Sequence, residues 1–318
     1  MMITLIGQLA CVASAKSLVH TRVHRTTSLD VYVADRTQEA LLVYPLEQNP
    51  SPVARITSGI AGIGGVAVDA SGNVYVANGG GRTGSPSVQE YSPGAASVLR
   101  VLTQGLHHPV SLTTDSNSNV WVTDQDQSLQ GASGIVEFGP TGTQPLQTLT
   151  TPDANAYLHG VAVDAAGDVF VSLSGIGDEF PPAESCNANH QPTVLAETFE
   201  TSSSNPPPGW IHIYLGYNVQ EWGIALDPNG NLFASDFACN DVEVYTPPIS
   251  SPVHSYSPGV ALAAPMYLTI ESGAVAVPNA GDGTSGFVTI GGENSIGLPF
   301  VINQGLEGPI GAAVGSAT

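Results

Sequence analysis

A unit of two short strands joined by a tight turn recurs along most of the chain, and this repeat limits the folds that the chain can adopt. Successive copies begin their second strand 43 to 63 residues apart. The copies are SLDVYVAD (28–35, a half-copy), GVAVDASGNVYVAN (65–78), SLTTDSNSNVWVTD (111–124), GVAVDAAGDVFVSL (160–173), GIALDPNGNLFASD (223–236) and YLTIESGAVAVPN (267–279). Self-similarity at this spacing is typical of architectures in which each copy forms one supersecondary unit.

The residues within one copy predict a strand, a turn and a second strand. The first segment, such as GVAVD, is apolar on both faces, and its small residues suit a crowded position where several sheets meet. In the turn D-x-x-G-N the aspartate accepts backbone N–H groups and the glycine takes a positive φ. Ser118 replaces this glycine in one copy, so we expect that turn to differ.

Two further strands follow the repeated unit. The third ends in an aromatic residue near a proline, and a looser fourth strand comes next, as at 53–56 and 98–102. Four strands in just over forty residues are the signature of a propeller blade. The N-terminal copy lacks its innermost strand, and the segment 304–314 supplies one without the rest. We therefore predict an all-β fold: a single six-bladed β-propeller with four antiparallel strands per blade, closed by the C-terminal strand joining the N-terminal blade.

The pattern P-x-G-V-A-V-D-x-x-G-N-V-Y-V-A-D, followed by a strand that ends in Tyr-x-Pro, resembles the NHL repeat. The resemblance covers about residues 28–314 and implies a six-bladed propeller. It implies little about activity, because these repeats are scaffold motifs. Relatives of this general shape include binding modules, lyases and lactonases.

The N-terminus is typical of an export signal. Residues 3–15 are apolar and end in Ala-Ser-Ala. We expect an extracytoplasmic protein, secreted or periplasmic, with a plain apolar N-terminal strand or a misassigned start codon as the alternative. The predicted organisation is a signal peptide over 1–15, an N-terminal extension over 16–27 and a propeller over 28–318, with an insertion at 173–193.

The charge balance excludes some partners. The chain has 7 Lys+Arg against 27 Asp+Glu, a net charge of −20. Phosphate binding needs clustered cations, so we expect no nucleic acid partner and no docking on an anionic membrane surface. Beyond the N-terminus, no stretch approaches the ~20 apolar residues that span a bilayer. We expect a monomer that binds a protein, peptide or glycan.

In a propeller, the loops after the second strands and the residues that open the innermost strands share one face, which we call the loop face. The opening residues are mostly apolar: Gly64, Val110, His159, Trp222, Met266 and Ile310. Predicted ligand-binding residues are His159 and Trp222, with His108 and Glu221 nearby. The alternative for His159 is a partly buried polar residue that is hydrogen-bonded to a loop.

Two functions remain open. The favoured hypothesis is a non-enzymatic, exported NHL-type propeller that acts as a binding scaffold through its loop face, without a cofactor. The alternative is a metal-dependent lyase or hydrolase, lactonase-like or amidating-lyase-like, in which His108, His159 and Glu221 hold an ion such as zinc in the central channel. Bound calcium is a further possibility, because acidic residues crowd the loop face: Asp178, Glu179, Asp236, Asp241 and Asp282.

Two other features of the loop face are interpreted as structural. Five of six loops after the second strand begin with Asp or Asn, which satisfy loop amides: Asp35, Asn78, Asp124, Asp236 and Asn279. Cys186 in the insertion and Cys239 in the equivalent loop of the next blade are disulfide candidates, since neighbouring loops bring them within reach in an exported protein. Two free thiols are the alternative.

Overall fold

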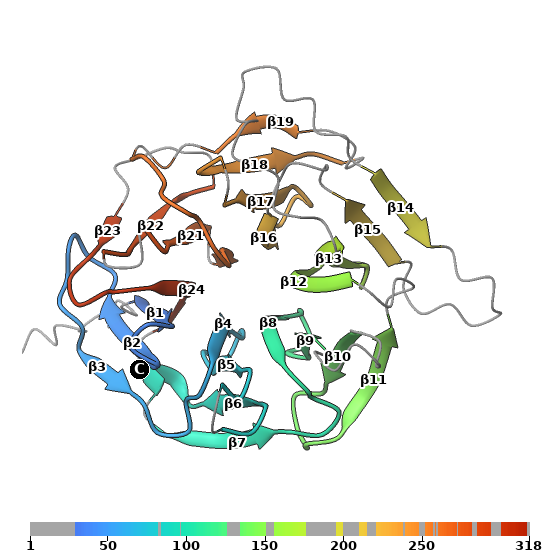
Figure 1. Cartoon of the computed structure of the whole chain (residues 1–318), viewed down its shortest axis with the longest axis horizontal. Helices are drawn as coiled ribbons and strands as arrows, with labels where there is room; N and C mark the ends of the chain where they lie inside the picture. Colours follow the sequence, from blue (N-terminus) through green and yellow to red (C-terminus); the bar gives the residue numbers. More distant parts are fainter. Residues whose placement is uncertain are drawn as a thin grey trace, which may run out of the picture.

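In the part of the chain that the structure describes, six sheets of four strands each are arranged around a central axis in a propeller-like, all-β structure (Figure 1). In each sheet the innermost strand faces the axis. The computed structural model describes residues 29–81, 84–95, 97–125, 134–150, 156–175, 195–199, 210–214, 221–237, 239–247, 252–256, 258, 260–271, 273–281, 285–293 and 300–316. Among these residues no helix is long and apolar enough to cross a membrane.

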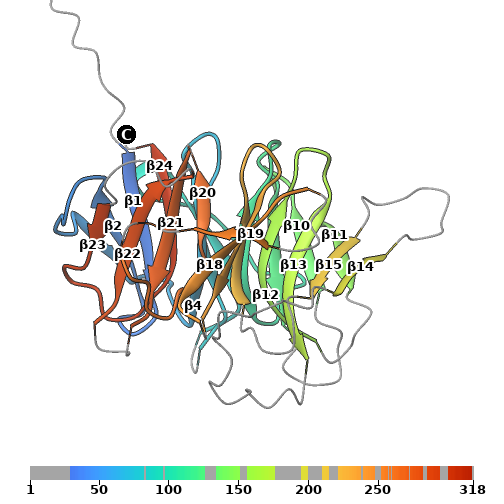
Figure 2. The same ribbon diagram turned by 90° about the horizontal axis from the view of Figure 1, so that it is seen from above.

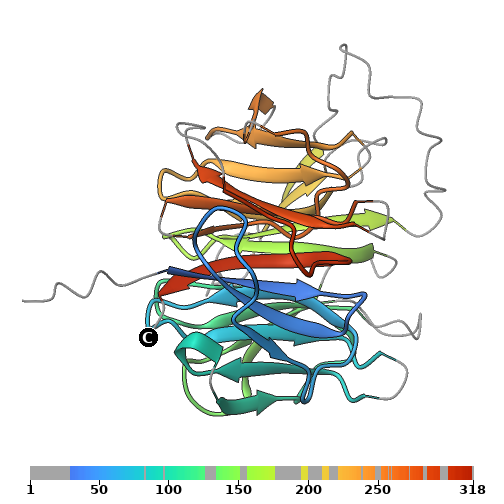
Figure 3. The ribbon, with the colours of Figure 1, turned by 90° about the vertical axis from the view of Figure 1, so that its left-hand side faces the viewer.

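The first sheet joins strands from both ends of the chain. β24 (Pro309–Ser316) pairs antiparallel with β1 (Leu29–Asp35), and β2 (Ala40–Pro45) and β3 (Ala54–Ile56) follow outward. Figures 2 and 3 show β24, in red, beside the blue β1. The predicted pairing of the C-terminal strand with the N-terminal sheet is therefore present.

Four further sheets keep their strands in chain order from the axis outward, and all their pairs are antiparallel. A 3₁₀ turn, η1 (Pro93–Ala95), follows β6. The strands are β4 (Ile63–Val68), β5 (Val74–Asn78), β6 (Ser87–Tyr91) and β7 (Val98–Leu102); β8 (Pro109–Thr114), β9 (Val120–Asp124), β10 (Gly134–Phe138) and β11 (Pro145–Thr150); β16 (Glu221–Leu226), β17 (Leu232–Asp236), β18 (Asp241–Tyr245) and β19 (Pro252–Ser255); β20 (Thr269–Glu271), β21 (Ala274–Asn279), β22 (Phe287–Gly292) and β23 (Phe300–Ile302).

The remaining sheet departs from the predicted antiparallel pattern. Its order is β12 (Ala156–Val163), β13 (Val169–Gly175), β15 (Trp210–Tyr214) and β14 (Leu195–Phe199), and β13 pairs with β15 in parallel. A tight hairpin forces neighbouring strands to be antiparallel, whereas a long connection permits a parallel pair. Here the long segment after β13 lets the chain form the outer strand first. The first three residues of the predicted insertion, 173–175, belong to β13, which extends to Gly175. The remaining residues, 176–193, lie outside the described residues.

Glycines let the innermost strands approach one another backbone to backbone. A Cβ on Gly64 would lie 2.1 Å from the Val110 carbonyl oxygen of the next sheet. A Cβ on Gly223 would lie 2.6 Å from backbone atoms of Met266, Tyr267 and Leu268. The predicted crowding of the innermost strands is therefore confirmed, and these positions exclude larger residues.

We expect Gly223→Ala to lower the free energy of unfolding by about 1–3 kcal/mol, because the added methyl group meets three backbone atoms that cannot move independently. Chemical denaturation monitored by tryptophan fluorescence measures the change. Gly139→Ala is the matched control, since a Cβ there meets its nearest neighbour, Leu146, at an ordinary 3.5 Å. Equal stability of the two variants would contradict the packing argument.

The D-x-x-G turns fold as their sequence predicts. Asp69 Oδ1 accepts the backbone N–H groups of Ser71 (2.8 Å) and Asn73 (2.9 Å), and its Oδ2 accepts the Tyr75 hydroxyl (3.2 Å). The expectation that the Ser118 turn differs is wrong. Ser118 itself takes a positive φ of 60°, and Asp115 accepts the same amides as the other turn aspartates. The two side-chain-to-amide bonds hold the turn in shape despite the unfavourable residue.

Candidate functional site

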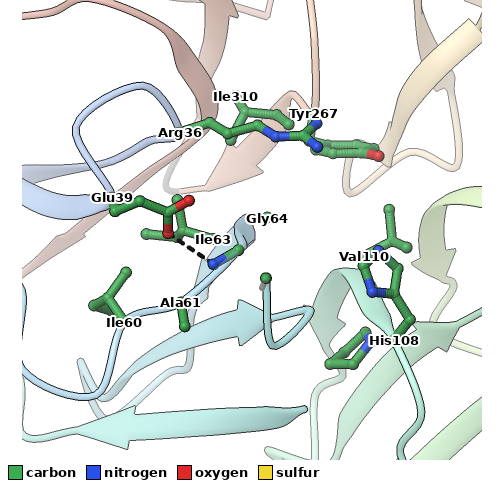
Figure 4. A pocket seen from close by; sticks show the side chains of 13 residues that line it. Arg36, Glu39, Ile60, Ala61, Ile63, Gly64, His108, Val110, Tyr267 and Ile310 are labelled. Carbon is green, nitrogen blue, oxygen red and sulfur yellow. Dashed lines mark hydrogen bonds between the residues drawn. The ribbon is translucent and has the colours of Figure 1, made fainter. Parts of the chain in front are cut away.

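The loop face carries a pocket of about 470 Å³, which we call the mouth pocket (Figure 4). Three of the residues that open innermost strands line it: Gly64, Val110 and Ile310. Arg36 and Glu39, from the loop between β1 and β2, and His108, just before β8, contribute its polar groups. Apolar side chains and a few polar groups converge there, as they do in small-molecule sites.

Asp and Asn side chains at the ends of the second strands hold the loops that form the mouth pocket. Asp124 accepts the backbone N–H groups of His107 (2.9 Å) and His108 (2.7 Å). Asp35 accepts those of Glu307 (2.8 Å) and Gly308 (3.2 Å), just before β24. The same contact joins Asn279 to the Ala263 N–H (2.9 Å). The structural interpretation of these residues is confirmed, because each of the three fixes the approach to the innermost strand of its own sheet.

Arg36 brings the only permanent positive charge among the residues that line the mouth pocket. Its backbone N–H donates to the Gly308 carbonyl (2.8 Å), while its side chain is exposed and makes no ion pair with any residue that the structure describes. Figure 4 shows the guanidinium extending toward Tyr267. Burial raises the pKa of Tyr267, and the charge of Arg36 opposes that rise.

Glu39 closes one side of the mouth pocket. Its Oε2 accepts the backbone N–H of Gly62 at 2.7 Å, which ties the loop between β1 and β2 to the approach to β4. Glu39 has a positive φ of 46°, an uncommon conformation for a residue with a side chain. The carboxylate therefore has a structural role at the rim of the pocket.

His108 presents one ring nitrogen to a backbone carbonyl. Its Nδ1 lies 2.9 Å from the Gly79 oxygen. Because a carbonyl can only accept, Nδ1 carries the hydrogen and Nε2 of the neutral ring is an acceptor. A Cβ on Gly79 would lie 2.6 Å from His108 Cε1, so the glycine makes room for the ring.

The structure describes only part of the predicted metal-ligand set. His108 lines the mouth pocket, whereas His159, in β12, is not among the residues that line it. Burial lowers the pKa of His159 to about 4, so its ring is neutral near neutral pH. Glu221 and Trp222 lie in β16, and their side chains are outside the described residues. Within the described part of the chain, no group of three or more His, Cys, Asp or Glu is placed to hold a metal ion.

The acidic residues of the loop face that can be described have protein partners. Asp236 accepts the Cys239 N–H (2.9 Å), and Asp241 accepts the Val242 N–H (2.8 Å) and the Ser255 hydroxyl (2.6 Å). The other three residues of the calcium prediction lie outside the described residues: Asp178, Glu179 and Asp282.

Cys239 is disulfide-bonded. The chain has two other cysteines, Cys11 and Cys186, and both lie outside the described residues. The pairing of Cys239 with Cys186 therefore stays a prediction.

A second cavity, of about 870 Å³, which we call the central cavity, is lined by residues of the innermost strands and shares Tyr267 with the mouth pocket. Glu271, at the end of β20, lines it and accepts the N–H groups of Val68 (3.1 Å) and Val314 (3.0 Å) from two other innermost strands. Burial raises the pKa of Glu271 to about 8; the two amides oppose this shift, and the charge of Asp69 adds to it.

Sequence reasoning missed Glu271, Arg36 and Tyr267. The signal for Glu271 is present in the repeat, because glutamate stands where the other complete copies have the turn aspartate. Its longer side chain reaches neighbouring strands instead of its own turn. Arg36 could have been noticed as one of only seven cations in the chain, next to the Asp35 that holds a loop.

We expect the free energy of unfolding to fall as the pH rises from about 4.5 to about 8, because the folded state retains the Glu271 proton that the unfolded state loses. One proton gives a slope of at most about 1.4 kcal/mol per pH unit. Denaturation at several pH values should show a flatter slope for Glu271→Gln than for the exposed control Glu47→Gln. An unchanged slope in Glu271→Gln would contradict this assignment.

Comparisons with known proteins show the fold and no family. No family model matches the sequence, and no curated protein matches it. Among solved structures, a protein of unknown function from Bacteroides caccae is similar with a TM-score of 0.64 and 10% identity, over 91% of this chain and 99% of that chain. A functionally unknown protein from Desulfotomaculum acetoxidans has a TM-score of 0.57 and 11% identity, over 91% and 99% of the two chains.

A virginiamycin B lyase from Staphylococcus aureus is also similar, with a TM-score of 0.53 and 11% identity, over 89% of this chain and 84% of that chain. Identities this low establish a shared propeller fold and say nothing about a shared activity.

Proposed function

We propose that this chain is an exported, non-enzymatic binding module, built as a closed six-bladed NHL-type propeller, that holds its ligand at the mouth pocket. The observation that carries the proposal is the pocket itself. Its volume of about 470 Å³ and its lining, in which apolar side chains alternate with polar groups, suit the end of a peptide, a sugar or a small molecule.

Two observations support the architecture and compartment in this proposal. The six four-stranded sheets and the pairing of β24 with β1 support six blades and a closed ring. The disulfide at Cys239 supports export, because such bonds persist mainly in oxidising compartments. We propose Cys186 as its partner, because the repeat in the sequence predicts the two cysteines in equivalent loops of neighbouring blades.

We expect Val110→Trp to weaken ligand binding at least about tenfold, because the indole would fill the mouth pocket that Val110 lines. Peptide and oligosaccharide arrays find ligands for the wild-type protein, and thermal-shift titration compares the variants. Val98→Trp is the matched control, since Val98 is 50% exposed on the outer strand β7. Ligands that bind Val110→Trp as tightly as the control would contradict the proposed site.

The alternative function is a metal-dependent lyase or hydrolase acting in the centre of the propeller. Two observations favour it: the fold shared with a virginiamycin B lyase, and a glutamate with a raised pKa in the central cavity. Perturbed carboxyl groups in a cavity occur at catalytic sites, although burial alone also produces them.

Elemental analysis separates the two functions. We expect no tightly bound ion in protein purified without added metal or chelator, nor after calcium or zinc is added and the protein is dialysed, because the described residues offer no ligand set. One retained ion per chain would favour the metal-dependent alternative over the binding module.

A further inference from the structure

We propose that the mouth pocket selects a small organic monocarboxylate, whose carboxylate pairs with the Arg36 guanidinium while its apolar part packs on Ile63, Val110 and Ile310. The inference rests on the proposed function and names the class of ligand at the same site. It depends on one arrangement in the structure: a guanidinium without a carboxylate partner beside an apolar wall.

The charge of Arg36 is unmatched in a chain where carboxylates are abundant. The chain carries a net charge of −20, yet no described carboxylate forms an ion pair with Arg36. Glu39, the one carboxylate that lines the pocket, accepts the Gly62 N–H at 2.7 Å. Arg100, by contrast, is paired with Glu90. The Arg36 guanidinium is therefore open to an anion from outside the chain.

The shape of a guanidinium and the number of cations favour a carboxylate. The planar fork of arginine matches the two oxygens of a carboxylate with parallel hydrogen bonds. Phosphate groups, which carry more charge, are bound by clusters of cations. Arg36 is the only lysine or arginine that lines the pocket, so one negative charge is the best match.

The apolar residues that line the pocket favour a ligand with an apolar body. Figure 4 shows Arg36 and Val110 on different sides of the pocket, with Ile310 near the arginine. Ile63 and Ile310 are almost fully buried and present the edge of the core to the pocket, while Val110 is partly exposed. Because Ile63 and Ile310 leave little surface exposed, most of the apolar surface that a hydrocarbon group would cover belongs to Val110.

The test compares an acid with its neutral analogue. The probes are 3-phenylpropionate and 3-phenylpropionamide, which differ in charge and share the phenyl group, and inorganic phosphate. Binding is measured by NMR chemical-shift titration of the full chain at low salt. We expect the acid to bind at least about tenfold more tightly than the amide and than phosphate, because a charge-assisted pair is stronger than a neutral hydrogen bond.

Two variants locate the charge. Arg36→Gln should abolish the preference for the acid, because it weakens binding of the acid much more than binding of the amide. Arg55→Gln, which removes the same charge from the exposed strand β3, should keep the preference. The Arg36 side chain makes no ion pair in the described structure, so we expect both variants to fold, which their melting temperatures check.

Each outcome bears on the inference. Equal binding of acid and amide, a preference that survives Arg36→Gln, tighter binding of phosphate, or no binding of the acid to the wild-type protein would overturn it. If the amide binds as tightly as the acid and Val110→Trp removes the binding of both, the inference fails while the proposed binding site stands. If Val110→Trp changes the binding of no probe or array ligand, the proposed site itself fails.

Discussion

The close approach of the innermost strands is the constraint on which the rest of the structure depends. At Gly64 and Gly223 the backbone of one sheet lies against the backbone of the next, with no room for a Cβ. Buried valines and aromatic residues then pack between neighbouring sheets as the strands diverge outward. Near the centre, two cavities that share Tyr267 in their lining offer space for a ligand.

Hydrogen bonds from the ends of the second strands hold the loops that lead into the innermost strands. A side chain at the end of a second strand, such as Asp35 or Asp124, binds the amides that lead into the innermost strand of the same sheet. The residues beside these contacts, Arg36 and His108, thereby reach the mouth pocket from two different sheets. The buried carboxylates of Asp35 and Asp124 thus hold the loops so that neighbouring side chains line the mouth pocket.

The two cavities differ in their electrostatics. The mouth pocket has a guanidinium and no uncommitted carboxylate, whereas the central cavity holds Glu271, whose carboxyl is buried and linked to the amides of two other strands. In a chain with a net charge of −20, a single well-placed arginine changes the character of one pocket more than the overall charge does. The net charge of the chain therefore does not predict the charge of the mouth pocket, which depends on where Arg36 lies.

The sequence by itself determined the strands, their turns and the pairing of the two chain ends, because periodic apolar residues and the D-x-x-G turn act through neighbours along the chain. It did not determine the strand order around β15, where a long connection allows a parallel pair. It also did not determine which side chains meet: His108 lines the mouth pocket without His159, the other histidine predicted at the loop face, whereas Arg36 and Tyr267 line it together. Contacts among residues from separate sheets depend on how the sheets pack about the axis, which only the tertiary structure decides.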